Sequence, residues 1–266
     1  MRTLITEYKR MFFEKRIIWL IVITVIYVTV CSLFWNLKYK LDYGYFEISY
    51  KLSAFKLWQD IINEIYVRVL MKIVPCIVCV FSFMDDRKNG IDNQICIRNH
   101  SNIYYMVKYI TVITGGMLYN FLSVILIYVP LYFLLSTGDD GWNYLDRYEA
   151  YVGKFFTGNT AVEFVLVIAV CYAFVGGVYS AMSYVISMWI DNRVLVCIMP
   201  YIICEILQNV LYIVRKVTLA NTIFSEVDVL MNDRPFIHWV HYFVLWILFL
   251  SILLIISYTI NIKNKK

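Results

Sequence analysis

Long apolar stretches separated by short polar segments dominate the chain. Six of these stretches lie at about 17–36, 61–84, 109–135, 161–189, 194–214 and 239–262. A helix of about 20 apolar residues is long enough to cross the hydrocarbon core of a bilayer. Inside that core each backbone polar group needs a partner within the protein, which favours helices. The pattern therefore predicts an all-α integral membrane protein with six transmembrane helices in one domain, 17–266.

Residues 1–16 carry a different pattern. Apolar positions recur there at helical spacing, and the positions between them are polar or basic, as with Thr6, Lys9 and Arg10. A helix with one apolar and one basic side lies in the membrane interface and contacts anionic lipid headgroups. We predict such an amphipathic interfacial helix at 1–16, the alternative being an ordinary charged flank of the first span.

The connecting segments differ in charge. If the N-terminus is inside, the inner segments hold 13 Lys and Arg against six Asp and Glu, and the outer segments hold nine against ten. Cations concentrate in the cytoplasmic loops of membrane proteins. We therefore expect a multi-pass protein of the cell membrane with both termini in the cytoplasm and outer loops at 37–60, 136–160 and 215–238. The last loop is apolar enough to predict short re-entrant helices between spans five and six.

Composition narrows the function classes. Of the residues, 61% are apolar and 16% are charged, whereas a soluble domain has about 25% charged residues. There is no G-x-x-x-x-G-K-[ST] phosphate loop and no H-E-x-x-H pair. His238 and His241 lie one turn apart without an acid or cysteine assured nearby. We expect no metal site, no catalytic residues, no enzymatic activity of its own and no nucleic-acid partner.

The longest inner segment, about 85–108, begins with charged residues and contains a glycine that should end the second span. Its candidate contact residues are Asp85, Asp86, Arg87, Gly90, Arg98 and Ser101. Ser101 or Asn102 fits the cap of the next helix. We interpret the segment as containing a short surface helix that docks into a partner; the alternative is a merely solvated connection.

Taken together, these features resemble the ABC-2 type permeases, the membrane subunits of ATP-binding cassette exporters. The resemblance covers nearly the whole chain and rests on a basic N-terminal helix with Glu7 and Arg10, on Asp85, Asp86 and Gly90 after the second span, and on Lys108 entering the third. Many relatives have Glu at the acidic position followed by Gly-Thr, whereas Ile91 follows Gly90 here.

The resemblance implies that the N-terminal helix and the inner loop contact cytoplasmic ABC ATPase subunits. ATP would bind to those subunits, so this chain would need no cofactor. The pathway would form between this chain and a second copy or a related permease, within membrane lipid, and would export a peptide, a lipid-like molecule or a drug-like molecule. The alternatives are a membrane-embedded enzyme and a non-transporting immunity or sensing subunit.

Three charges fall within predicted spans. Arg68 and Lys72 are four residues apart in span two, and Glu205 lies in span five. At 1.5 Å per residue, Lys72 lies about 16 Å from the outer end and Glu205 about 16 Å from the inner end of the membrane. A lone charge at that depth costs about 2.5–3.5 kcal/mol. We therefore predict that Lys72 and Glu205 share one environment, as a buried pair or as a polar pathway lining.

Small and helix-breaking residues add two expectations. Gly176 and Gly177, with Ser180 and Ala181, have the spacing of a close helix contact in membranes. Proline removes a backbone donor and kinks helices. Kinks are therefore expected at Pro75, Pro130 and Pro200.

Overall fold

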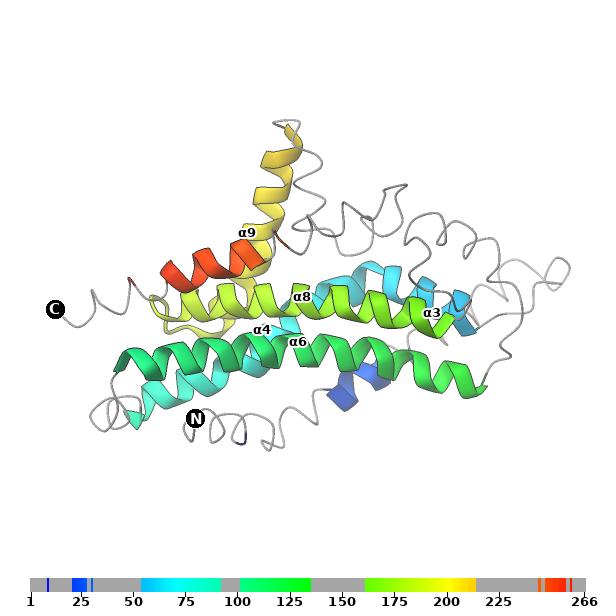
Figure 1. Cartoon of the computed structure of the whole chain (residues 1–266), viewed down its shortest axis with the longest axis horizontal. Helices are drawn as coiled ribbons and strands as arrows, with labels where there is room; N and C mark the ends of the chain where they lie inside the picture. Colours follow the sequence, from blue (N-terminus) through cyan, green and yellow to red (C-terminus); the bar gives the residue numbers. More distant parts are fainter. Residues whose placement is uncertain are drawn as a thin grey trace, which may run out of the picture.

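The computed structural model describes residues 21–27, 54–91, 101–134, 161–213 and 247–256, with the single residues 9, 30, 244 and 259. These residues form helices, with short described turns at 64, 89–90 and 188–192, and no strand occurs among them. The main elements are α3 (Ala54–Asn63), α4 (Ile65–Lys88), α6 (Ser101–Leu134), α8 (Ala161–Ser187) and α9 (Arg193–Ile213). Figure 1 shows α6 and α8 running alongside each other, while α9 projects away from them.

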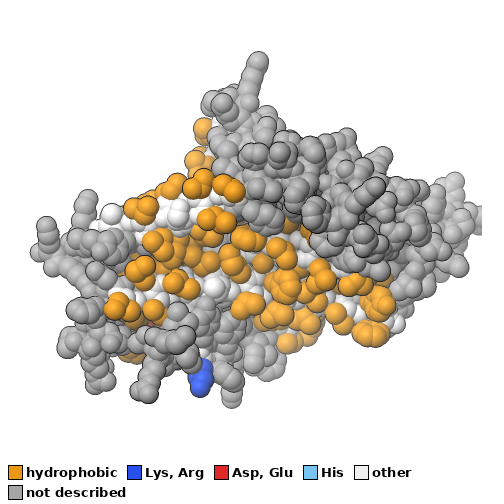
Figure 2. Space-filling view, viewed as in Figure 1, with side chains coloured by type: hydrophobic (Ala, Val, Ile, Leu, Met, Phe, Trp, Pro, Cys, Tyr) orange, Lys and Arg blue, Asp and Glu red, His pale blue; other side chains and the backbone are white. Residues whose placement is uncertain are grey.

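Three helices are long and apolar enough to cross a membrane. They cover Ile65–Lys88, Ile103–Phe133 and Val165–Ser187, and a shorter apolar helix covers Ile247–Ile256. Hydrophobic side chains cover the described part of the face in Figure 2. Such a surface suits lipid and not water. The helical class expected from the sequence is confirmed, and the three long apolar helices agree with the expected membrane protein.

The helix bounds follow the apolar stretches, with two differences. The stretch predicted at 109–135 belongs to a helix that begins at Ser101, inside the segment predicted as inner loop. The stretch predicted at 61–84 is broken at Glu64, whose backbone is extended (φ −61°, ψ 134°), and α4 continues to Lys88. The polar inner connection between these helices is therefore shorter than the predicted 85–108.

A buried helix, α3, occupies the end of the predicted outer loop 37–60. Trp58 is fully buried there, and its indole N–H donates to the Val124 carbonyl of α6 at 3.2 Å. The same ring lies edge-on to Tyr128, with 5.9 Å between ring centroids. Buried Trp needs a partner for its N–H, so this contact fixes α3 against α6. The end of the loop is therefore part of the core and not a solvated connection.

The contact between α6 and α8 depends on glycine. A Cβ added to Gly116 would lie 2.1 Å from Ser180 Oγ and 2.6 Å from the Gly176 carbonyl oxygen. A Cβ added to Gly176 would lie 2.4 Å from the Gly116 carbonyl oxygen. Small residues let two membrane helices approach until their backbones touch. The close contact predicted at Gly176 and Gly177 is confirmed, with Gly116 as its counterpart.

Two of the prolines are compensated by a neighbouring helix. Pro75 has no N–H, so the carbonyl of Met71, four residues earlier, has no helical donor. The Asn120 amide of α6 donates to that oxygen at 3.0 Å. In α9, Pro200 likewise leaves the Val196 carbonyl without a helical donor, and Ser183 Oγ of α8 donates to this carbonyl at 2.9 Å. Buried carbonyls inside a membrane require such partners.

Several predicted features lie outside the described residues. These are the helix at 1–16 apart from Lys9, the loop residues 92–100, the outer segments 136–160 and 215–238, and the histidines at 238 and 241. Glu7, Arg10 and Arg98 belong to this part of the chain. Their roles stay predictions.

Candidate functional site

The last turn of α4 carries the charges that the sequence marks as a docking segment. The helix ends at Lys88, and Gly90 follows with φ +66°, a conformation that glycine adopts without steric cost. The prediction that Gly90 ends the helix is thus confirmed. Consecutive helical residues point about 100° apart, so Asp85, Asp86 and Arg87 reach three different neighbours.

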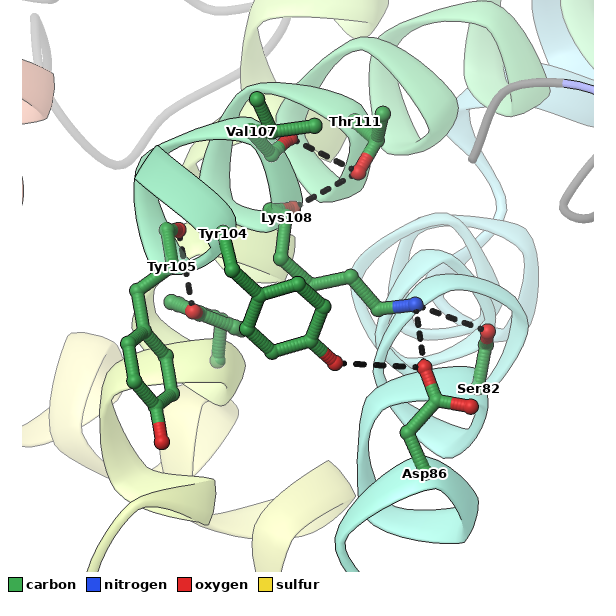
Figure 3. A network of polar contacts seen from close by, with 8 residues as sticks. Ser82, Asp86, Tyr104, Tyr105, Val107, Lys108 and Thr111 are labelled. Atoms are coloured by element: carbon green, nitrogen blue, oxygen red, sulfur yellow. Dashed lines mark hydrogen bonds and ion pairs between the residues drawn. The ribbon is translucent and has the colours of Figure 1, made fainter. Parts of the chain in front are cut away.

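Asp86 contacts α6. Its side chain is buried, and Oδ2 accepts from Lys108 Nζ at 2.7 Å and from the Tyr104 hydroxyl at 3.4 Å (Figure 3). Lys108 Nζ also donates to Ser82 Oγ of α4 at 3.4 Å. Acid and amine leave 1% and 3% of their side chains exposed. Neither charge could be left alone in such a place, so the network ties the end of α4 to the start of α6.

Asp85 and Arg87 contact the turn between α8 and α9. Asp85 accepts from the guanidinium of Arg193, the first residue of α9. Arg87 Nη1 donates to the carbonyls of Ser187 and Met188 at 3.0 and 3.2 Å. A cation at the last carbonyls of a helix interacts favourably with its dipole. Arg87 therefore caps α8, and Asp191 lies 3.6 Å from the same guanidinium.

Asn192 explains why α9 begins at Arg193. Its side-chain Oδ1 accepts from the backbone N–H groups of Val194 and Leu195 at 3.0 and 3.3 Å. Asparagine is among the preferred N-cap residues because its oxygen satisfies donors that the first turn leaves open. The cap fixes the start of α9 and places Arg193 within reach of α4.

A second charged contact joins the same two helices farther along. Lys72 Nζ of α4 lies 3.4 Å from Glu205 Oε1 of α9 and 5.6 Å from the centre of the Tyr201 ring. The lysine is buried, while the glutamate side chain is 38% exposed. Arg68, four residues before Lys72, is half-buried. Of the two arrangements predicted for Lys72 and Glu205, the structure has the direct pair.

The structure places the sequence-derived candidates in two groups. Asp85, Asp86 and Arg87 lie together at the end of α4, and Lys72 lies with Glu205 within the bundle. Ser101 begins α6, as the predicted cap position requires to within one residue. The sequence reasoning missed Arg193, Asp191 and Asn120 as contact residues. Asn120 could have been recognised from the sequence, because an amide side chain in a long apolar stretch needs a hydrogen-bond partner.

Each single replacement in the pair, Lys72→Ala or Glu205→Ala, is expected to destabilise the fold. We expect roughly 2–3 kcal/mol for Glu205→Ala, because it leaves the buried Lys72 without its acid, and less for Lys72→Ala, because the Glu205 side chain is 38% exposed. The double replacement Lys72→Met with Glu205→Leu should recover part of this loss, since it removes both charges. Unfolding of all four proteins in detergent gives the coupling free energy.

Glu64→Gln serves as the matched control, because this acid is exposed at the other end of α4. It should leave the unfolding midpoint unchanged. Additive effects of the two single replacements would show that Lys72 and Glu205 do not interact.

Comparisons with known proteins give no further constraint: no protein-family model, curated protein or solved structure matches this chain.

Proposed function

We propose that this chain is the permease subunit of an ATP-driven exporter of the ABC-2 type. In this proposal it has six spans, an interfacial helix at 1–16 and re-entrant helices at 215–238, and it lies in the cell membrane with both termini in the cytoplasm. It forms the pathway as a dimer with a second copy or a related permease. A separate ATPase binds and hydrolyses ATP, and the substrate is a peptide, a lipid-like molecule or a drug-like molecule.

The observation that carries the proposal is the set of charged contacts at the end of α4. Asp86 connects this end to α6, Asp85 connects it to α9, and Arg87 caps α8. A partner that pushes on the connection between α4 and α6 would therefore act on four helices together. Such a linked platform is what an external ATPase needs in order to shift a helical bundle between two states.

Exposed groups remain at this platform for a partner. Arg87, Lys88 and Asn89 are exposed at the end of α4, next to the predicted docking loop. Asp85 and Asp86 face the chain's own helices, so we assign them the role of holding the platform together. Direct contact with the ATPase then falls to Lys88 and the following loop, including Arg98. The contribution of Glu7 and Arg10 to the same surface stays part of the proposal.

The test is purification of the tagged chain from its native membrane with identification of the bound proteins. An ATPase with a phosphate loop should copurify, and Lys88→Glu should lower its recovery because the charge at the docking surface is reversed. Glu64→Lys, a reversal at the opposite end of α4, should not. Recovery without any ATPase would reject the proposal, and an ATPase bound without substrate efflux would favour an immunity or sensing role.

A further inference from the structure

The two charged contacts between α4 and α9 have matching spacing. Asp85 and Lys72 are 13 positions apart on α4, and their partners Arg193 and Glu205 are 12 positions apart on α9. At 1.5 Å per residue these spacings are about 20 and 18 Å. The two helices run in opposite directions, so both pairs fit a single antiparallel register.

Each cation is also held by an aromatic ring of the opposite helix. The guanidinium of Arg193 lies 5.4 Å from the centre of the Phe81 ring, and Phe81 precedes Asp85 by four positions. Lys72 Nζ lies 5.6 Å from the Tyr201 ring, and Tyr201 precedes Glu205 by four positions. Residues four apart are neighbours on a helix surface, and a cation within about 6 Å of a ring centre is attracted to it.

The contacts are therefore two copies of one motif. In each, an aromatic residue and an acid four positions later on one helix enclose a cation from the other helix. Phe81 and Asp85 of α4 enclose Arg193, and Tyr201 and Glu205 of α9 enclose Lys72. We call these contacts the inner clamp (Phe81, Asp85, Arg193) and the mid-span clamp (Lys72, Tyr201, Glu205).

The two clamps place their charges in opposite order on the two helices, and this order favours one register over the others. The acid belongs to α4 in the inner clamp and to α9 in the mid-span clamp. Sliding one helix by a turn would separate both cations from their acids, which is costly for the buried Lys72. Beyond Cys204, which is buried, many described side chains of α9 are exposed. Figure 1 shows α9 projecting away from α6 and α8.

We propose that α4 and α9 move as one unit, held in a single antiparallel register by these two reciprocal clamps. Because Asp86 and Arg87 tie the same end of α4 to α6 and α8, the clamps also set the angle of α9 to the α6–α8 pair. The mid-span clamp fixes the pair within the membrane, and the inner clamp fixes the angle at which α9 starts. This mechanical coupling does not depend on the identity of a substrate or an ATPase.

The test is a spin-label distance between Val210 of α9 and Leu122 of α6, both exposed. The full chain is labelled in nanodiscs, in a background without native cysteines. Without further changes, the distance between the two labels is expected to have a narrow distribution. Asp85→Asn or Glu205→Gln should broaden it, and Glu64→Gln, outside both clamps, should not. Exchange of the inner charges, Asp85→Arg with Arg193→Asp, should narrow the distribution again.

Two outcomes would overturn the proposal. One is a distribution that stays unchanged in both Asp85→Asn and Glu205→Gln, which would show that the clamps do not set the position of α9. The other is an exchanged protein that stays as broad as Asp85→Asn, which would show that charge pairing is not the cause. If Asp85→Asn does not fold, the exchanged protein is compared with the unaltered protein instead, and a broader distribution in the exchanged protein would overturn the proposal.

Discussion

Asp86→Ala is expected to lower the free energy of unfolding by about 3–5 kcal/mol, because it leaves the buried Lys108 ammonium without its acid. Lys108→Ala should have a similar effect, since both side chains are almost fully buried. The double replacement Asp86→Leu with Lys108→Met should be close to neutral or stabilising, because well-packed apolar groups remove the desolvation cost. Unfolding midpoints in bicelles would measure all three.

The neighbouring acid provides the matched control. Asp85 pairs with Arg193, whose side chain is 45% exposed, and partly exposed pairs contribute only about 0.2–1 kcal/mol. Asp85→Ala should therefore cost far less global stability than Asp86→Ala, even though it releases the inner clamp. Equal losses at the two positions would show that Asp86 and Lys108 are not a desolvated pair in the native protein.

Gly116→Ala is expected to destabilise the α6–α8 contact by roughly 2–3 kcal/mol, in the upper range for overpacking. The new methyl group would meet the Gly176 carbonyl oxygen at 2.6 Å as well as the Ser180 side chain. A side chain can rotate away, but a helix backbone can yield only if the helices separate. Thermal unfolding in detergent and the yield of folded protein would measure the loss.

Gly177→Ala is the control for the same helix pair. The three atoms nearest to its Cβ would all be side-chain atoms, with Met117 Cγ at 2.8 Å, Met117 Cε at 2.9 Å and Ile113 Cγ2 at 3.4 Å. Met is flexible and yields easily, while Ala gains up to about 1 kcal/mol over Gly in helix propensity. The variant should be near neutral. Similar losses for Gly116→Ala and Gly177→Ala would contradict a backbone contact at Gly116.

The positions of several helices could be predicted from the hydropathy of the sequence and from its turn residues. The predicted stretches 161–189 and 194–214 correspond to helices at Ala161–Ser187 and Arg193–Ile213, and Gly90 ends α4. The shared environment of Lys72 and Glu205 followed from helix rise and span direction, which place two residues at one depth without any knowledge of neighbours. Membrane physics makes depth a strong constraint, because a lone charge is excluded there.

The partners of Asp85, Asp86 and Arg87 could not be obtained in the same way. Arg87 and Ser187 are 100 positions apart, and Asp85 and Arg193 are 108 apart. Which helices adjoin α4, and how each is rotated, does not follow from apolar periodicity. The sequence therefore indicated a charged surface, whereas in the fold all three side chains make contacts within the chain. Helix α3 was missed for another reason: its helical pattern was present around Trp58 but was assigned to a loop.

The hydrogen bonds at Pro75 and Pro200 affect how this bundle can change shape. A proline kink can act as a swivel when its unsatisfied carbonyl faces water or changes partners freely. Here Asn120 holds the Met71 oxygen and Ser183 holds the Val196 oxygen, each from an adjacent helix. Bending either helix at its proline would have to break one of these hydrogen bonds, and an apolar surrounding offers the freed carbonyl no replacement. The hydrogen bonds from Asn120 and Ser183 therefore act as braces, and helices α4 and α9 should resist bending at these prolines.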